Sequence, residues 1–108
     1  MWADGYIAKL VLKGETVQFR PRGNSMQGRI ESGQLCTVEP VCREPIVGDI
    51  VLCRVAGSQY LHLVTGVKTK KQRNGGISVK YRISNNKGHD NGWISISAIY
   101  GICTSVTD

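Results

Sequence analysis

Ser25 is the residue whose type and setting first suggest chemistry. It lies in a bend of small, turn-forming residues, Gly23-Asn24-Ser25, directly before the apolar Met26. A serine hydroxyl is a weak nucleophile until a neighbouring base takes its proton, so catalysis also requires a base, an orienting group and a scaffold that brings them together. A serine in such a bend is more often an ordinary turn residue, because its hydroxyl can bond the local backbone. The bend alone is consistent with both interpretations.

Length and composition predict one small globular domain, residues 1–108. The chain has 108 residues, of which 41% are hydrophobic and 20% charged, with 13 glycines and no biased tract. These values are typical of a folded domain with one core. No apolar run approaches the roughly 20 residues of a membrane-spanning helix, and Met1 to Tyr6 lack the features of a secretion signal. We therefore expect a cytoplasmic protein without membrane association.

The cysteines predict neither a metal site nor a disulfide framework. Cys36, Cys42, Cys53 and Cys103 show no Cys-x-x-Cys spacing, and only two histidines accompany them. Structural zinc sites use closely spaced pairs of such ligands. We expect reduced, mostly buried thiols and no cofactor.

The net charge of +6 includes a basic cluster formed by Lys68, Lys70, Lys71 and Arg73. Electrostatic attraction could bring this cluster to nucleic acid or another acidic partner. A solvated hairpin tip accounts for the same residues. We favour the solvated tip, because the cluster is short and has no adjacent aromatic residue on which bases could stack.

The residue pattern predicts short strands separated by turns. Tyr6 to Phe19 alternates in places and favours a hairpin around Lys13-Gly14-Glu15, with a first helix up to Leu12 as the alternative. The bend around Ser25 leads into a short helical turn over Met26 to Ile30. Further strands are expected at Leu35–Glu39, Asp49–Val55, Gln59–Val64, Val64–Lys68, Ile77–Ile83, Trp93–Ile96 and Ile99–Cys103.

Two hairpins are expected among these strands. Gly57-Ser58 joins the strands on either side of it, and Asn74-Gly75-Gly76 forms the turn of the next pair. Ser84 to Gly92 is polar and is expected to be a loop. Short strands at nearly regular spacing indicate a mainly antiparallel sheet, folded into a sandwich or partly open barrel.

An ordered series of short motifs resembles the superfamily of LexA-type repressor peptidases and signal peptidases. The family pattern is a Gly-x-Ser-Met segment, a turn, a Gly-Asp-Ile-Val strand start, a strand with the base, an Asn-containing loop and a strand ending in Gly. The matching segments cover nearly the whole chain and are Gly23–Met26, Ile30, Gly33, Val47–Val51, Tyr60–Val64, Ile83–Asn86 and Ile99–Ile102. The resemblance implies a small, mainly β, partly open coiled barrel of the LexA/signal-peptidase catalytic-core type.

By this resemblance Ser25 is the nucleophile, and His62 stands at the position of the base. Relatives carry lysine there in the repressor peptidases and bacterial signal peptidases, and histidine in the endoplasmic-reticulum and archaeal type. Imidazole titrates at about pH 6.5 and is mostly neutral at neutral pH, whereas a lysine must first be desolvated. A strand histidine without chemical role is the alternative.

The resemblance also implies a group that orients the base. Asp90 lies in the loop where histidine-type relatives carry an acidic residue, and a carboxylate there would fix the imidazole tautomer. Asp90 could instead cap the turn before Asn91-Gly92, and Asn85 is then the orienting residue. Backbone amides near Ser25, helped by Asn24, are expected to stabilise the oxyanion.

Three departures from the family pattern bear on activity. Gln27 stands where the family has a proline after the Ser-Met pair, the lysine base is absent, and we expect neither a helix-turn-helix nor a membrane anchor. Met26 is expected to line the substrate groove, to fill the core, or both.

The expected function is a small serine endopeptidase that cleaves an extended peptide bound along a strand edge. A catalytically inactive peptidase-like module, acting as a binder or inhibitor through its groove or its basic tip, is the second hypothesis. A nucleic-acid binder is the third, on charge alone.

Overall fold

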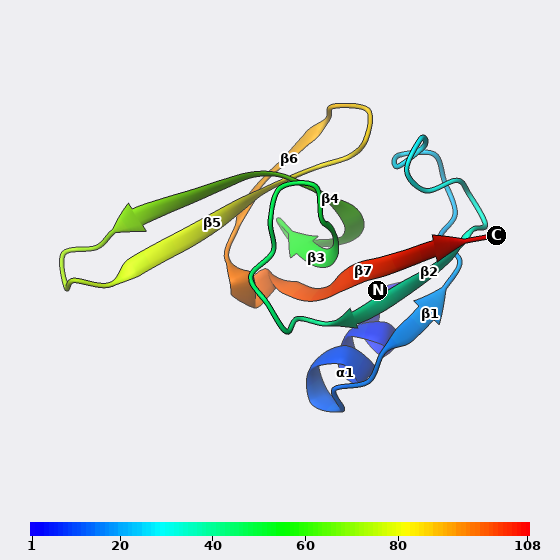
Figure 1. Ribbon diagram of the computed structural model, residues 1–108, viewed down its shortest axis with the longest axis horizontal. Helices are drawn as coiled ribbons and strands as arrows, with labels where there is room; N and C mark the ends of the chain where they lie inside the picture. Colours follow the sequence, from blue (N-terminus) through cyan, green and yellow to red (C-terminus); the bar gives the residue numbers. More distant parts are fainter.

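The computed structural model describes residues 1–108 and contains seven antiparallel strands in one open sheet, with one short α-helix (Figure 1). This confirms the expected mainly β, antiparallel class. The strand order is β1-β2-β7-β3-β4-β5-β6. The elements are α1 (Asp4–Leu12), β1 (Val17–Phe19), β2 (Leu35–Pro40), β3 (Ile50–Val55), β4 (Ser58–Lys71), β5 (Ile77–Ser84), β6 (Asp90–Ile94), the 3-10 turn η1 (Ile96–Ala98) and β7 (Ile99–Thr107).

The first segment is a helix, so the expected N-terminal hairpin is wrong and the alternative helix ending at Leu12 is confirmed. Tyr6, Ile7 and Leu10 recur at helical spacing and pack in the apolar cluster beneath the sheet. The apolar residues of this segment fit both a strand and a helix in part, and their burial against the sheet favours the helix. Gly14, at φ +65°, follows the helix in the left-handed conformation that glycine adopts without strain. With nine residues, α1 is too short to span a bilayer.

Strand β3 lies in the middle of the sheet and is buried on both faces. Leu52 belongs to the apolar cluster that includes α1, whereas Val51 and Cys53 belong to a second cluster on the other face. Alternate residues of a strand point to opposite faces, so the continuous apolar run is what a doubly buried strand requires. In this register Val51 stands opposite His62 of β4.

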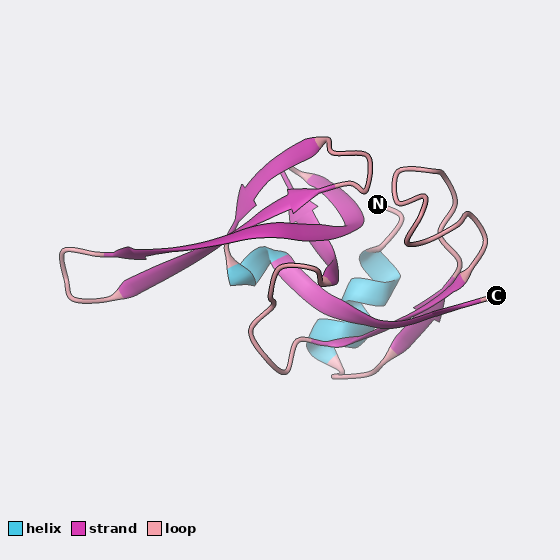
Figure 2. Ribbon diagram, turned by 45° about the horizontal axis from the view of Figure 1, so that its top comes forward, coloured by secondary structure: helices cyan, strands magenta, loops and turns pink.

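Strand β4 has 14 residues and changes partners halfway along. It pairs with β3 from Ser58 to Leu63 and with β5 from Leu63 to Lys71, with a register shift between Val64 and Gly66. Both predicted hairpins are therefore confirmed, although the two strands expected on either side of Val64 are one. The outer parts of β4 and β5, with the turn between them, project as a two-stranded ribbon (Figures 1 and 2), which contributes to extents of 47 × 33 × 23 Å.

The connection between β5 and β6 is shorter than the loop expected from Ser84 to Gly92. Strand β6 begins at Asp90 and pairs with β5, and Ile96 belongs to η1 rather than to a strand. Strand β7 pairs with both β2 and β3, and so joins the two halves of the sheet.

Candidate active site

Ser25 and His62 come together from two different elements. Ser25 is half-buried in the turn between β1 and β2, and His62 is buried in the inner half of β4. The Oγ of Ser25 lies 3.3 Å from Nε2 of His62. This separation is at the long end for a hydrogen bond, as catalytic pairs commonly are before substrate binds.

The second ring nitrogen of His62 is held by Asn91. Nδ1 lies 2.8 Å from Oδ1 of Asn91, and an Nδ1–H that donates to this oxygen leaves Nε2 free to accept the Ser25 hydroxyl proton. The ring of Tyr60 stacks on the imidazole with a centroid separation of 4.7 Å. Ser25, His62 and Asn91 thus form one chain of hydrogen bonds.

Burial lowers the pKa of His62 below its ordinary value of 6.5, and the charge of His89 lowers this pKa further, while the hydrogen bond to Asn91 acts in the opposite direction. Removal from water disfavours the charged imidazolium. The ring is consequently neutral at neutral pH, which is the state a general base needs.

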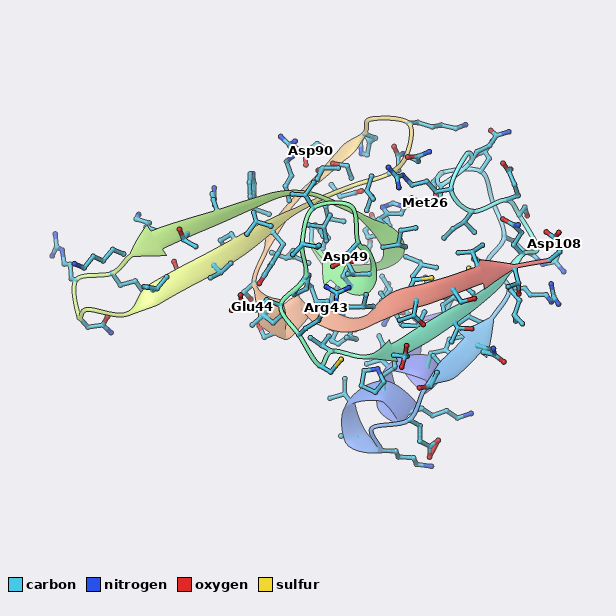
Figure 3. The ribbon with its side chains drawn as sticks, in the orientation of Figure 1. Met26, Arg43, Glu44, Asp49, Asp90 and Asp108 are labelled. Carbon is cyan, nitrogen blue, oxygen red and sulfur yellow. The ribbon has the colours of Figure 1, made fainter.

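The prediction that Asp90 orients the base is wrong, and its alternative role is the observed one. Oδ1 of Asp90 accepts the Gly92 N–H at 2.8 Å, and in Figure 3 the exposed Asp90 is drawn apart from Met26, the residue that follows Ser25. Asp90 stands opposite Ser84 and Gly92 opposite Ile83, so Asn91 is the extra residue of a β-bulge. Bulges re-aim side chains, which explains why Asn91 and not its neighbour reaches His62.

Asn85 does not orient the imidazole either. Its Oδ1 accepts the N–H groups of Lys87 and His89 at 2.8 and 2.9 Å, so it shapes the β5–β6 loop. The signal for Asn91 was the glycine that follows it, since a glycine next to a strand residue often marks a bulge.

Asn86 ties the nucleophile turn to the same loop. Its backbone N–H donates to the Ser25 carbonyl at 2.9 Å and its Nδ2 donates to the Gln27 carbonyl at 2.8 Å. Its Oδ1 accepts Nε of Arg29 at 2.9 Å. A Cβ on Gly28 would lie 3.0 Å from the Asn86 amide, and Gly28 has φ +97°, so glycine suits this contact. The carbonyl of Gln27 is thereby fixed.

The turn also presents unpaired backbone donors. The N–H groups of Asn24, Ser25 and Met26 donate to no acceptor of the chain. Groups of this kind form oxyanion holes when they face the reacting carbonyl. The Asn24 side chain is exposed and makes no hydrogen bond within the chain, so its expected help in the oxyanion hole stays a prediction.

A hollow of about 210 Å³ opens beside the Ser25–His62 pair. Met26, only 5% exposed, both lines it and fills the apolar cluster of α1, as expected. The other lining residues are Trp2, Pro21, Arg22, Gly23, Ile30, Glu31, Gln59, Tyr60 and Leu61.

The inner half of β4 has a free edge at this hollow. Residues Ser58 to His62 pair with β3 alone. The Trp2 indole N–H donates to the Gln59 carbonyl at 3.2 Å, so the backbone polar groups of Gln59 point away from β3. Every second residue of an antiparallel strand points the same way, so the backbone polar groups of Leu61 also point away from β3. Backbone donors and acceptors are therefore available next to the pair.

The basic cluster lies away from this site. Lys68, Lys70, Lys71 and Arg73 are exposed on the ribbon and its tip. The basic cluster has no aromatic neighbour in the sequence, but it has one in the folded chain. Strand β6 pairs with β5 and brings the Trp93 ring centroid to 4.2 Å from the Lys68 ammonium.

All four thiols are free, with Cys36 and Cys53 buried and Cys42 exposed. Burial raises the pKa of Cys53 to about 12, so it is an inert thiol at neutral pH. No group of three or more His, Cys, Asp or Glu side chains is arranged to hold a metal ion.

Comparison with known proteins gives no match for this chain, either among protein-family models or among curated protein sequences.

Proposed function

We propose that the protein is a serine endopeptidase of the LexA/signal-peptidase type, with Ser25 as nucleophile, His62 as general base and Asn91 as the residue that orients the base. The observation that carries this proposal is the chain of hydrogen bonds from Ser25 through His62 to Asn91, with separations of 3.3 and 2.8 Å. Serine catalysis requires a nucleophile, a base and an orienting group that are joined by hydrogen bonds in this order.

In the acylation step, Nε2 of His62 takes the proton of the Ser25 hydroxyl as Oγ attacks the peptide carbonyl carbon. The resulting imidazolium keeps its Nδ1–H on Asn91 and then gives the Nε2 proton to the leaving amine nitrogen, so the peptide bond breaks and an acyl ester forms on Ser25. Water then attacks this ester with His62 again as the base, which releases the carboxylic acid and restores the hydroxyl.

Asn91 performs only part of what a carboxylate would do. It fixes the ring and accepts Nδ1–H, as the asparagine of papain-like peptidases does, but it adds no negative charge. This agrees with the direction of the His62 pKa, which lies below its ordinary value.

Substrate binding would use the free edge of β4. An extended peptide can add a strand to an open edge through main-chain hydrogen bonds. Here the edge groups are the Gln59 N–H and the N–H and carbonyl of Leu61, since the Gln59 carbonyl already accepts the Trp2 indole N–H. The hollow beside Ser25 would take one substrate side chain. Small residues next to the scissile bond are expected from the family resemblance alone.

Membership of the LexA/signal-peptidase class is part of the proposal and is supported by the Gly48-Asp49-Ile50-Val51 segment. Arg43 donates to both oxygens of Asp49 at 2.7 and 2.9 Å, a pairing visible in Figure 3. Asp49 also accepts the Ile46 N–H at 2.8 Å. The turn fixed in this way leads into β3, in which Val51 stands opposite His62 of β4.

The test is cleavage of a defined mixture of synthetic peptides, with products identified by mass spectrometry. Wild type and Ser32→Ala should give the same products, because Ser32 lies in the same region and only accepts the Gly23 N–H at 3.2 Å. Ser25→Ala should give none. Identical products from Ser25→Ala, or no cleavage by any of the three proteins, would contradict the proposal.

A peptide-binding module without catalysis is the second candidate, and the free edge of β4 favours it. This edge and its hollow would bind an extended peptide whether or not Ser25 reacts. Calorimetric titration of Ser25→Ala with peptides from the same mixture measures binding without cleavage. Peptide binding, together with a wild type that never cleaves, would support the binding module over the peptidase.

A further inference from the structure

The projecting ribbon and its base carry all of the excess positive charge of the chain. Residues 65–84 contain six of the 14 Lys and Arg residues and no Asp or Glu, and the eight basic residues elsewhere balance the eight acidic ones. The net charge of +6 is therefore concentrated in one projecting element. Such an asymmetric distribution favours binding to a polyanion.

The lysines gather on one face of the ribbon. Lys68 stands opposite Lys80, and Lys70 opposite Ser78, and residues that face each other across two strands share a face. All three lysines are exposed, and none forms an ion pair, since the two ion pairs of the molecule are Met1–Asp4 and Arg43–Asp49. Same-face neighbours along a strand are about 6.6 Å apart, so the ammonium groups form a row.

Trp93 supplies an aromatic surface on the same face. It stands opposite Arg82 of β5, which in turn stands opposite Gly66 of β4. A Cβ on Gly66 would lie 3.1 Å from Cη2 of the indole, so the glycine leaves room for the ring. The indole is 40% exposed and the Lys68 ammonium lies over it.

Arg82 belongs to the base of the ribbon rather than to its free surface. Its Nε donates to Oγ1 of Thr65 at 3.1 Å. Asp90 lines the same hollow as Arg82, and Glu44 lines a second hollow together with Tyr81 and Lys80. Beyond this base, the lysine row has no carboxylate neighbour on the ribbon.

We propose that the face bearing Lys68, Lys70, Lys80 and Trp93 binds single-stranded nucleic acid. The ammonium groups contact successive phosphates, and an unpaired base stacks on the Trp93 indole as Lys68 turns from the ring to a phosphate. A duplex offers no free base for this stacking. The peptidase site does not take part, so this binding and the proposed cleavage can fail independently.

The experiment measures the fluorescence anisotropy of a labelled oligothymidylate titrated with the full chain. Lys68→Gln/Lys70→Gln/Lys80→Gln should weaken binding at least about tenfold and should reduce the slope of log K against log salt by about 2, since each phosphate contact on a single strand contributes about 0.7. The matched control Lys9→Gln/Lys13→Gln/Arg54→Gln removes the same charge from exposed positions outside the ribbon and should bind nearly as wild type does.

Trp93 gives a second readout. Trp93→Ala should weaken binding about tenfold through the lost stack, and Trp93→Phe should recover most of it. Ser25→Ala should bind as wild type does. Absence of binding, equal losses in both triple variants, equal affinity for a duplex of the same length, or equal competition by polyglutamate would each overturn the proposal.

Discussion

The two halves of strand β4 have the same backbone conformation but opposite surroundings. From Gln59 to Val64 nearly every side chain is buried, and His62 is held between Ser25 and Asn91. From Val67 to Lys71 every side chain is exposed, and the partner strand is β5 instead of β3. The register shift between Val64 and Gly66 separates the two halves.

This difference would let one strand support the two kinds of recognition that we propose. The inner half is packed on both faces of the sheet, so a side chain there can be fixed for chemistry and its pKa shifted by burial. The outer half is exposed to water, where its lysines can attract an anionic partner over a distance. We therefore expect the halves to respond independently to substitution.

The largest expected effect is the loss of peptide cleavage without a loss of nucleic-acid binding. His62→Ala should lower kcat for peptide cleavage by about 10³ to 10⁴, because the residues of a serine site act as a unit. Oligothymidylate binding should be unchanged in this variant. The triple lysine variant of the ribbon should show the reverse pattern, and a loss of both activities in either protein would contradict the independence of the halves.

The halves should also differ in local stability. Amide hydrogens of residues 67–70 and 77–80 should exchange at least about 100-fold faster than those of 60–63, because a two-stranded ribbon opens without unfolding the core. Hydrogen exchange followed by mass spectrometry measures both segments at once. Equal protection of the ribbon and of residues 60–63 would contradict the expected difference in local stability.

Substitution of Asn86 tests how strongly the β5–β6 loop positions Ser25, the proposed nucleophile. Asn86→Ala removes two side-chain hydrogen bonds, so we expect a loss of about 1–2 kcal/mol in the free energy of unfolding and a drop in kcat of about 10- to 100-fold. Asn74→Ala is the matched control, because it removes a similar bond to Gly76 at the ribbon tip. Its kcat should equal that of wild type, and a kcat loss in both variants would show a general effect.

The smallest expected effect concerns the titration of His62. Activity requires the neutral ring and should fall as the pH drops through a pKa below 6.5. In Asn91→Asp a carboxylate beside Nδ1 favours the imidazolium and raises this pKa, so the acid limb of kcat/KM should move to higher pH by about 1 unit. An unchanged or lower midpoint would show that residue 91 does not face the imidazole.

Much of the sheet could be predicted because strand alternation and turn residues are local signals. Gly57-Ser58 and Asn74-Gly75-Gly76 marked the hairpins, and motif order alone suggested that Ser25 and His62 would meet. The N-terminal segment could not be predicted in the same way. Its apolar residues fit a strand and a helix in part, and packing of Leu10 against the sheet decides the outcome.

The missed residues depend on features that no local pattern shows. Asn91 reaches His62 through a bulge, which shifts the alternation by one residue, and Asp90 consequently takes the turn-capping role. Trp93 meets Lys68 only because β6 pairs with β5. Asn86 belongs to the Ile83–Asn86 segment of the family resemblance, but its role follows from contacts with a turn distant in sequence.

The most direct test of the central claim is the reaction of Ser25 with a fluorophosphonate at neutral pH, followed by intact mass and peptide mapping. Activation by His62 predicts one adduct on Ser25 in wild type, and its absence or very slow formation in His62→Gln. No adduct in wild type, or an equal rate in His62→Gln, would contradict the claim that His62 activates Ser25.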